Sequence, residues 1–504
     1  MAILRVKTES GAVVGLPAGN RAVSVFKGIP YAAPPVGEAR WREPQPVAPW
    51  TGEREAYRFS QIAPQPDKAP GTFYHKEYFP IHEAYSEDCL YLNIWTPAVT
   101  GHERMPVFVW IHGGGFKEGF GHTMGYDGEA YAANGVVTVT LNYRLGIFGF
   151  LADRELTAQS PHHSSGNYGL LDQIAALAWV RRNIAAFGGD PDCVTLCGQS
   201  AGGISVQMLC SSPLTRGLFH RAIIQSGGGL HAILEKPLLT LREAEELDEV
   251  RTVLHVENIR QARQLSTEDL LRLELEGSFY RRDNLPIADG YFLKEDLNTA
   301  AYQGRLHDIP YLIGCTLDEG LPIWQMDRVR FARHMNTVLG EKKAREYLAL
   351  CPMEDEDAFH TFCSQLMQER LWVGVNAWCR LQAHLGRAPS YLYRFTRGLP
   401  GPDCPGAVHS SEHWYVFRTF LRSWRPMEEA DFRLSMTMSS YWMNFAKTGD
   451  PNGAGLPEWR PYTLDERCYM ELGTAQQLRP AELSPREAWS VEQMAREDGW
   501  TYQA

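Results

Sequence analysis

Residues 193–209 read CVTLCGQSAGGISVQML, and this stretch decides the fold. It begins with the short strand-like run CVTL, passes through Gly198-Gln199-Ser200-Ala201-Gly202, and continues into a helix-like segment at 205–209. A serine raised on a sharp turn between a strand and a helix needs small neighbours, because larger side chains would clash with the turn. The G-x-S-x-G pattern alone also fits a packing turn, so a role for Ser200 as nucleophile depends on the elements around it.

Strand-like and helix-like patterns alternate on both sides of this stretch. Continuous apolar or β-branched runs occur at 107–111, 136–141, 222–224, 311–313 and 391–395. Such runs are typical of strands buried on both faces of a largely parallel sheet. Between 171 and 187 the apolar residues follow helical spacing until Gly188 and Gly189 end the helix. We therefore predict an α/β fold with a doubly wound, mostly parallel sheet.

Helical patterns interrupt this alternation at roughly 239–300 and 325–385. Ser266, with Asp269 three residues later, resembles a capping box at the start of one such helix. No repeat, low-complexity tract or linker divides the sequence. We predict a single domain over 1–504, in which the two helical insertions form a cap or the walls of a gorge.

The composition excludes several classes of protein. The chain has 504 residues, of which 44% are hydrophobic and 22% charged, as in ordinary globular proteins and unlike disordered or collagen-like chains. A formal net charge of -11 argues against nucleic acid or an anionic membrane as partner. The sequence lacks an apolar run of 18 residues, so no transmembrane helix is predicted.

The cysteines and the N-terminus indicate a cellular compartment. The first residues lack the apolar core and cleavage site of a signal peptide. Of the ten cysteines, Cys193 and Cys197 lie four apart on a predicted strand, which separates their Cα atoms by about 13 Å, beyond the reach of a disulfide. We predict reduced thiols and a cytoplasmic location.

A second glycine-rich motif follows the first of these strands. His112-Gly113-Gly114-Gly115-Phe116 comes directly after the run VFVWI at 107–111. Consecutive glycines let the backbone approach a ligand and turn its N–H groups into a cavity. By itself the motif also fits a flexible loop. Together with the serine turn on a later strand, it favours acyl transfer through an oxyanion intermediate.

These motifs, in this order, resemble the type B carboxylesterases, which include bacterial para-nitrobenzyl esterases and animal cholinesterases. The resemblance runs almost from end to end. It is carried by FKGIPYAAPPVGEARW (26–41), SEDCLYLNIWTP (86–97), NYRLGIFGFL (142–151), NYGLLDQIAALAWV (167–180) and FAKTGDPN (445–452). The resemblance implies the α/β-hydrolase fold.

The resemblance also implies a catalytic triad. Its acid lies in a D-E-G turn, here Glu319, and its base in a G-x-x-H pattern, here His409. The order Ser200, Glu319, His409 agrees with that of α/β-hydrolases. By residue type alone, Glu319 is an ordinary turn carboxylate and His409 one of sixteen histidines.

Further roles follow from the same resemblance. Backbone N–H groups of Gly114, Gly115 and Ala201 are implied to form the oxyanion hole. No cofactor is implied, since water completes the reaction. His413 lies four residues after His409, a spacing that also suits zinc on a helix. No accompanying ligand cluster supports a metal, so we interpret His413 as structural.

The implied function is that of a serine carboxylesterase, which hydrolyses esters of small to medium apolar or aromatic substrates through an acyl-enzyme. Its implied partner is a small-molecule ester. Many family members have Glu before the nucleophile, whereas this chain has Gln199, which weakens the case for a cationic substrate. Cys89 lacks the upstream partner cysteine of secreted members. We expect Gln199 and Phe116 to contact substrate, while 73–80 and 321–324 are either pocket walls or packed loops.

Other functions remain open at this point. Some relatives have lost the serine and act as binding modules, but all three triad positions are filled here. A lipase, an amidase or a carbamate hydrolase would use the same triad, and the fold does not choose among them. The sequence leaves the oligomeric state open between a monomer and a weak homodimer.

Overall fold

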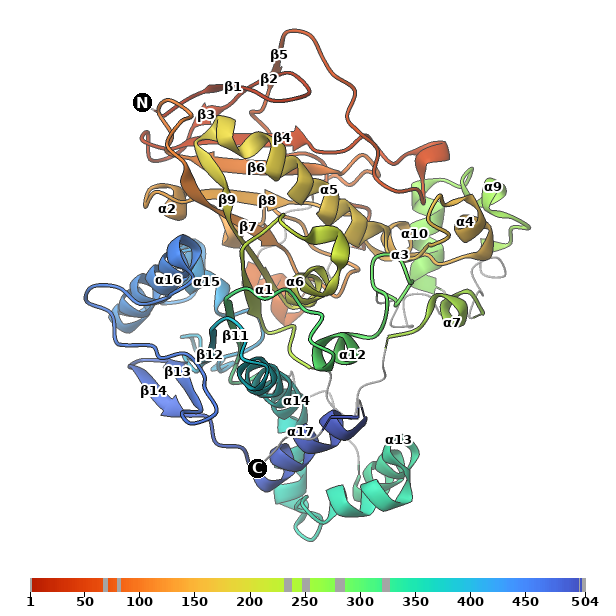
Figure 1. Cartoon of the computed structure of the whole chain (residues 1–504), viewed down its shortest axis with the longest axis vertical. Coiled ribbons are helices and arrows are strands. Elements are labelled where there is room, and N and C mark those ends of the chain that lie inside the picture. Colours follow the sequence, from red (N-terminus) through yellow and green to blue (C-terminus); the bar gives the residue numbers. More distant parts are fainter. Residues whose placement is uncertain are drawn as a thin grey trace.

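A single large sheet forms the centre of the molecule (Figure 1). The computed structural model describes residues 2–66, 71–78, 83–230, 238–246, 254–276, 286–319, 327–497 and 499–500. Across the sheet, its 11 strands are β14 (Gln476–Pro480), β13 (Cys468–Leu472), β12 (Ser390–Phe395), β11 (Tyr311–Thr316), β10 (Arg221–Gln225), β9 (Gly189–Gln199), β7 (Met105–Ile111), β8 (Val137–Leu141), β6 (Tyr91–Thr96), β4 (Ser24–Pro30) and β3 (Leu16–Pro17).

The middle of this sheet is parallel and its edges are antiparallel. Every neighbouring pair from β13 to β8 is parallel, whereas β14 pairs with β13, and β6 with β8 and β4, in antiparallel fashion. A separate 3-stranded sheet contains β1 (Arg5–Lys7), β2 (Ala12–Val14) and β5 (Glu53–Glu55). The predicted mostly parallel α/β sheet is confirmed.

Helices cover both faces of the sheet, because its strands are apolar on both sides. On β7, Val107 and Val109 belong to one core cluster, while Phe108 and Trp110 belong to a second cluster on the other face. The first cluster includes residues of α5 (Tyr168–Asn183), α6 (Ala201–Ser211) and α14 (Glu356–His384). The second includes residues of α15 (His413–Val416) and α16 (Glu429–Thr448). The sheet is therefore doubly wound.

Helices occupy both segments that the sequence identified as insertions. Between β10 and β11 lie α7 (Leu241–Glu246), α9 (Ile259–Ala262), α10 (Thr267–Glu276) and α12 (Leu297–Tyr302). Between β11 and β12 lie α13 (Arg328–Leu348) and α14. The predicted cap of α10 is present, since the Asp269 N–H donates to Ser266 Oγ at 3.0 Å. Part of α14 packs directly on the sheet, because Val375 and Trp378 are fully buried in the core cluster that covers it.

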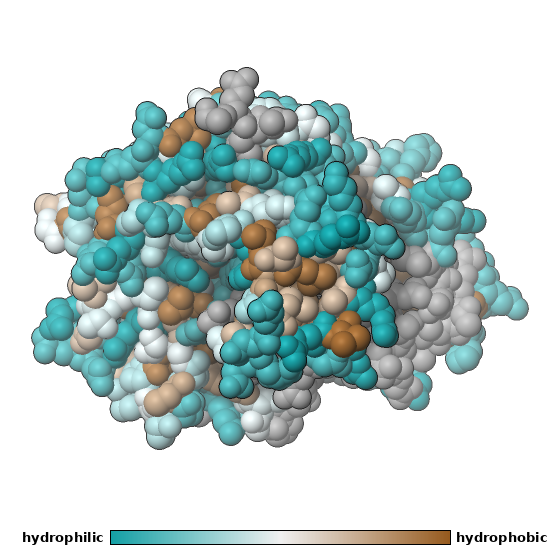
Figure 2. All heavy atoms as spheres, turned by 90° about the horizontal axis from the view of Figure 1, so that it is seen from below, coloured by the Kyte–Doolittle hydropathy of each residue, from teal (hydrophilic) through white to brown (hydrophobic). Residues whose placement is uncertain are grey.

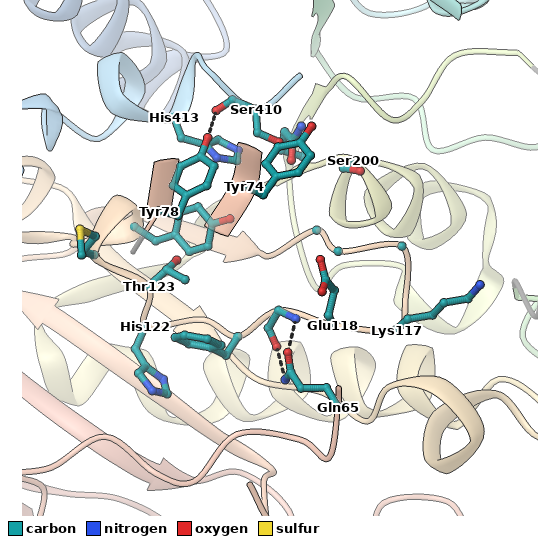
Figure 3. Close-up of a pocket in the computed structure, with 18 of the residues that line it drawn as sticks. Gln65, Tyr74, Tyr78, Lys117, Glu118, His122, Thr123, Ser200, Ser410 and His413 are labelled. Atoms are coloured by element: carbon teal, nitrogen blue, oxygen red, sulfur yellow. Dashed lines mark hydrogen bonds between the residues drawn. The ribbon is translucent and has the colours of Figure 1, made fainter. Parts of the chain in front are cut away.

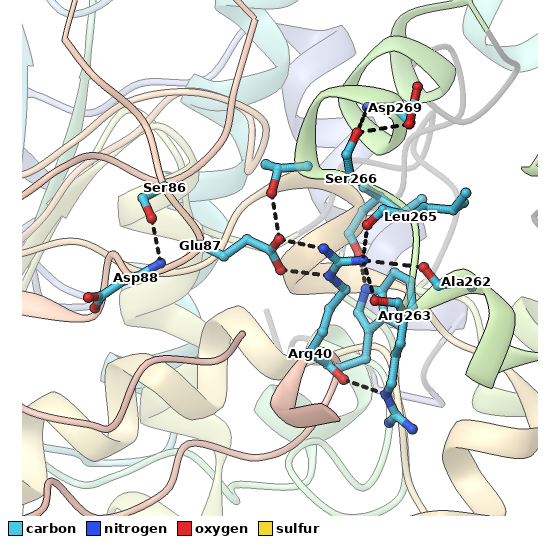
Figure 4. Close-up of polar contacts among 12 residues, drawn as sticks. Arg40, Ser86, Glu87, Asp88, Ala262, Arg263, Leu265, Ser266 and Asp269 are labelled. Carbon is cyan, nitrogen blue, oxygen red and sulfur yellow. Dashed lines mark hydrogen bonds and ion pairs between the residues drawn. The ribbon is translucent and has the colours of Figure 1, made fainter. Parts of the chain in front are cut away.

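A buried ion pair anchors α9 and α10 to the body of the molecule (Figure 4). Arg40 donates from Nε and Nη2 to the two carboxylate oxygens of Glu87, at 2.7 and 2.6 Å. The Thr267 hydroxyl at the start of α10 donates to Glu87 at 2.7 Å. Arg40 Nη1 donates to three backbone carbonyls, that of Ala262 at the end of α9 and those of Arg263 and Leu265 between α9 and α10. The pair thus holds together segments more than 170 residues apart.

The remaining helices and the surface need only brief description. Shorter helices are α2 (Glu129–Ala132), α3 (Gly146–Phe150) and α4 (Arg154–Gln159), and α17 (Pro485–Glu497) lies near the C-terminus. Seen from below, apolar side chains form small groups among hydrophilic ones (Figure 2). Within the described residues, none of the helices combines the length and hydropathy needed to span a bilayer. All ten cysteines are free thiols, and most are buried.

Candidate active site

Ser200 lies on a strained turn between β9 and α6. Its backbone angles are φ 56° and ψ -128°, a conformation that non-glycine residues rarely adopt. The small neighbours expected from the sequence are required. A Cβ on Gly202 would lie 2.1 Å from the Ile111 carbonyl oxygen, and one on Gly227, after β10, would lie 1.9 Å from the Ser200 carbonyl oxygen. The Ser200 N–H donates to the Gln225 carbonyl at 2.9 Å, which fixes the turn against β10.

The residues predicted as acid and base are in contact, although they lie 90 positions apart. Glu319 follows β11 and His409 follows β12, and these two strands are parallel neighbours. His409 Nδ1 lies 2.5 Å from Glu319 Oε2. The Thr316 N–H donates to the other carboxylate oxygen at 2.6 Å, so both oxygens of Glu319 are held. The Glu319 side chain is fully buried, whereas that of His409 keeps 22% exposure.

Asp318, which the sequence analysis did not single out, ties the acid loop to the base loop. Its N–H donates to the Ala407 carbonyl at 3.0 Å, and its carboxylate accepts from the Ala407 N–H at 2.7 Å. These two bonds join the residue before Glu319 to the residue two positions before His409. Only the sheet order brings the two loops together, so spacing in the sequence carried no signal for this role.

Charge and contacts set the state of His409. Burial opposes protonation of the imidazole, but the charge of Glu319 and the hydrogen bond that His409 donates to it prevail, so the pKa of His409 is raised above 6.5. On the opposite side of the ring, Gln199 Nε2 lies 3.2 Å from His409 Nε2. With Nδ1–H directed at Glu319, Nε2 carries the lone pair and accepts from the Gln199 amide.

A second buried carboxylate, that of Glu412, interacts electrostatically with Glu319 and His409. Glu412 is fully buried, and its Oε1 lies 3.4 Å from Gln225 Nε2 and 3.5 Å from Ser226 Oγ. Burial, followed by the charge of Glu319, raises the pKa of Glu412 to about 7, against the opposing charge of His409. Sequence reasoning missed this residue, because a Glu three positions after His409 carries no pattern of its own.

The glycine loop after β7 lies directly beside the serine. A Cβ on Gly113 would lie 2.6 Å from the Gln199 carbonyl oxygen and 2.9 Å from Ser200 Cβ, so only glycine permits this approach. Gly114 and Gly115 have φ of 113° and 63°. Ala201 begins α6, and N–H groups in the first turn of a helix have no acceptor within it. The three expected oxyanion donors therefore come from two elements that meet at Ser200.

A cavity of about 400 Å³ opens in front of these groups (Figure 3). Its wall includes Gly113–Gly115, Gln199, Ser200 and His409. The rest of the wall combines aromatic and polar side chains, namely Gln65, Tyr74, Tyr78, Glu83, Lys117, Glu118, Phe120, His122, Thr123, Met124, Tyr126, Ser410 and His413, together with Gly119. The volume is in the usual range for a small-molecule site.

Helix α1 (Phe73–Tyr78) forms one wall of the cavity and is bonded to the loop that carries His409. The Tyr78 hydroxyl donates to the Ser410 carbonyl at 2.7 Å, and the Tyr74 hydroxyl to the His409 carbonyl at 3.4 Å. Glu77 points the other way and pairs with the buried Arg425 at 2.7 Å. Of the described part of the segment 73–80, Tyr74 and Tyr78 line the cavity, whereas Phe73 packs against the core.

Other expected contacts lie elsewhere. Phe116 is 1% exposed and packs edge-on against Phe150, with ring centroids 5.2 Å apart. Its backbone turns the side chain into the core (φ 61°), so it lies outside the described cavity wall, contrary to our expectation. The expectation for 321–324 lies outside the described residues. Among residues that the structure describes, the cavity wall takes none from the segments 239–300 and 325–385.

The part of the chain that is described contains no group of three or more His, Cys, Asp or Glu suited to a metal ion. His413 is buried and its nitrogens have no hydrogen-bond partner among these residues. It does, however, line the cavity, which the sequence interpretation of His413 as purely structural did not anticipate.

Comparison with known proteins identifies the lineage. The sequence profile described as Carboxylesterase family matches residues 3–489. The fumonisin B1 esterase of Sphingopyxis macrogoltabida is 36% identical over 471 residues, which cover 90% of this chain and 83% of that protein. The para-nitrobenzyl esterase of Bacillus subtilis is 36% identical over 488 residues, covering 92% of this chain and 93% of its own length.

Solved structures agree with the sequences. A PNB esterase superposes with a TM-score of 0.83 at 32% identity, covering 96% of this chain and 99% of its own. A carboxylesterase of Geobacillus stearothermophilus gives 0.81 at 34% identity, with 97% and 100% covered. The fold is that of the α/β-hydrolases. From sequence and structure alike, the chain belongs to the carboxylesterase family and is a carboxylic ester hydrolase.

Proposed function

We propose that the protein is a serine carboxylesterase in which Ser200 is the nucleophile, His409 the base and Glu319 the acid. The observation that carries the proposal is the meeting of three features in one cavity. The strained turn exposes Ser200, the 2.5 Å contact orients His409, and the glycine loop lies against the Ser200 side chain.

The chemistry follows from these groups. His409 Nε2 takes the proton of Ser200 as the hydroxyl attacks the ester carbonyl, and later gives it to the leaving alcohol. Glu319 holds the proton on Nδ1 and stabilises the imidazolium. The N–H groups of Gly114, Gly115 and Ala201 stabilise the oxyanion. Water then hydrolyses the acyl-enzyme, so the reaction needs no cofactor.

The cavity supports small to medium apolar or aromatic esters as substrates. About 400 Å³ accommodates an alcohol and a short acyl chain. The rings of Tyr74, Tyr78, Tyr126 and Phe120, with Met124, provide apolar contact area. The neutral amide of Gln199 beside His409 adds hydrogen bonding without charge, which favours uncharged esters.

Two further features belong to the proposal. A cytoplasmic location is supported by the ten free thiols. A single domain over 1–504 is supported by the main sheet, whose strands extend from Leu16 to Pro480.

The test is substitution of the nucleophile. We expect Ser200→Ala to reduce kcat/KM for nitrophenyl esters by at least ~1,000-fold while leaving thermal unfolding unchanged. A fluorophosphonate should label the wild type at Ser200. Ser205→Ala, one turn further along α6, is the matched control and should keep both labelling and turnover. Labelling at another serine, or near wild-type turnover of Ser200→Ala, would refute the assignment. A series of graded acyl lengths with an anilide separates esterase from amidase activity.

A further inference from the structure

Gln65 lines the cavity, and the proposed mechanism gives it no role. Its amide binds both backbone groups of Gly119 (Figure 3). Gln65 Oε1 accepts from the Gly119 N–H at 2.7 Å, and Nε2 donates to the Gly119 carbonyl at 3.0 Å. Nε2 also donates to the Ala63 carbonyl at 3.0 Å. Both amide hydrogens of Gln65 are therefore used within the protein, and the group that they hold is the Gly119 peptide backbone.

Gly119 packs against the start of the glycine loop that follows β7. A Cβ on Gly119 would lie 2.4 Å from the Gly113 carbonyl oxygen and 2.6 Å from His112 Nδ1. Gly113 in turn approaches the serine so closely that its own Cβ would lie 2.9 Å from Ser200 Cβ. The position of Gly119 therefore limits where Gly113 can lie relative to Ser200.

The carbonyls of the loop set the direction of two of the proposed oxyanion donors. The Gly113 carbonyl oxygen lies 2.8 Å from His112 Nδ1, and the Gly114 carbonyl accepts from the N–H groups of residues 117–118 at 3.1 and 3.0 Å. In a planar trans peptide, the C=O and the following N–H point in opposite directions. The N–H groups of Gly114 and Gly115 therefore point away from these carbonyl partners.

Gln65 holds the closing end of this turn from a separate part of the chain. The earlier part of the loop is bonded to the segment 143–146, which donates to the carbonyls of His112 and Phe116 at 3.0 and 2.7 Å. At Gly119, both backbone groups are bonded to Gln65. Without this side chain, the residue that directly follows the turn would lose both of these bonds.

We propose that Gln65 is a positioning residue that holds the glycine loop in the conformation in which its N–H groups stabilise the oxyanion. This rests on the proposed function, because the oxyanion forms only when Ser200 attacks the ester. In this role Gln65 acts through Gly119, without a contact to the ester. Its loss should therefore lower kcat, which depends on the transition state, and leave KM nearly unchanged.

The test variant is Gln65→Met, which keeps the length of the side chain and removes the amide. For nitrophenyl butyrate, kcat should fall by about tenfold to a hundredfold, while KM should change by less than about twofold. Gln173→Met is the matched control, because Gln173 is fully buried outside the described cavity wall and its Nε2 donates to Ser205 Oγ at 3.1 Å. This control should keep kcat.

Two ketone inhibitors separate the oxyanion from general damage to the cavity. Ser200 adds to the carbonyl of an alkyl trifluoromethyl ketone: Oγ bonds to the carbonyl carbon, the π electrons move to the carbonyl oxygen, and the hydroxyl proton passes to His409. An oxyanion then remains in the site. The corresponding methyl ketone stays an unreacted carbonyl. In Gln65→Met the inhibition constant of the trifluoromethyl ketone should rise by about tenfold or more, while that of the methyl ketone should not change.

An unchanged inhibition constant of the trifluoromethyl ketone in folded Gln65→Met would overturn the inference, as would equal losses for both ketones. A fall in kcat of the same size in Gln173→Met would overturn it too. If Gln65→Met does not fold, Gln65→Glu takes its place with the same expectation, because its carboxylate still accepts from the Gly119 N–H and no longer donates to the carbonyl. Failure of the proposed function has a different signature, since Ser200→Ala would then bind the trifluoromethyl ketone as tightly as the wild type.

Discussion

Gln199→Glu places a negative charge against the imidazole of His409. The Gln199 amide lies 3.2 Å from His409 Nε2, and Gln199 is 1% exposed. A glutamate has nearly the same shape, so its carboxylate would occupy the position of the amide. It would favour the imidazolium over the neutral ring, and in the proposed mechanism only the neutral ring can accept the proton of Ser200.

The size of the effect follows from the distance. At 3.2 Å and an effective dielectric near 20, the attraction between the two charges is about 5 kcal/mol. Desolvation of the buried carboxylate removes a large part of this gain. One pKa unit corresponds to about 1.4 kcal/mol, so we expect the pKa of His409 to rise by about one to two units. The pKa is already raised by Glu319, and the two effects act in the same direction.

The assay is the pH dependence of kcat/KM for a neutral butyrate ester between about pH 5 and pH 9. The acid limb of this profile reports the pKa of the base in the free enzyme. In Gln199→Glu the limb should move to higher pH, and activity near pH 6 should fall by about tenfold for each pH unit that the limb moves. Gln199→Met, similar in length and uncharged, is the matched control and should move the limb much less. Equal limbs in the Glu and Met variants would show that the side chain at 199 does not contact His409.

Three further expectations follow from buried contacts. Glu412 has a pKa of about 7 in the folded protein, whereas its ordinary value is 4.5, so its contribution to stability falls as the pH rises from 4.5 to about 7. Over this pH range the free energy of unfolding of Glu412→Gln should fall by ~3 kcal/mol less than that of the wild type. Urea titration at the two pH values measures the difference. Gly227→Ala should displace Ser200 and lower kcat sharply, because the new Cβ would lie 1.9 Å from the Ser200 carbonyl oxygen. Gly125→Ala is the control and should keep its activity, since the space around Gly125 is open. Equal kcat values for the two variants would contradict the requirement for glycine at 227. Arg40→Ala leaves the buried Glu87 without its cationic partner and should reduce stability by about 3–5 kcal/mol, with faster proteolysis within 254–276. An unchanged melting temperature would refute the anchoring role.

The fold was predictable because its strands are continuous apolar or β-branched runs, which can be recognised from a few consecutive residues. The runs at 107–111 and 136–141 are apolar on both faces, and the structure shows helices covering both. The serine turn was recognisable from its five-residue motif, in which a Cβ on Gly198 would meet the carbonyl of Gly202, although Gly202 itself is required by the distant Ile111 carbonyl. Local patterns in the sequence therefore predicted the α/β sheet and the turn that carries Ser200.

The proposed acid and base, Glu319 and His409, could not be predicted from local patterns, because distant contacts bring them together. Glu319 and His409 lie 90 residues apart and meet only because β11 pairs with β12, which periodicity does not reveal. The resemblance named them, and their roles stay predictions. Phe116 illustrates the limit, because its neighbouring glycines suggested a pocket while its backbone turns the ring into the core. Glu412 belongs to no sequence motif, and only its burial in the structure identified it as unusual.

Helix α1 has a consequence for how the enzyme tolerates substrates of different bulk. Its tyrosines form part of the cavity wall, and they are also bonded to the carbonyls of Ser410 and His409. Glu77 holds the same helix through the buried Arg425. A ligand too large for the cavity cannot push this wall aside without moving the peptide that carries His409, the proposed base. Poor fit should therefore appear as slower turnover of bound substrate, with kcat falling, more than as weaker binding, with KM rising.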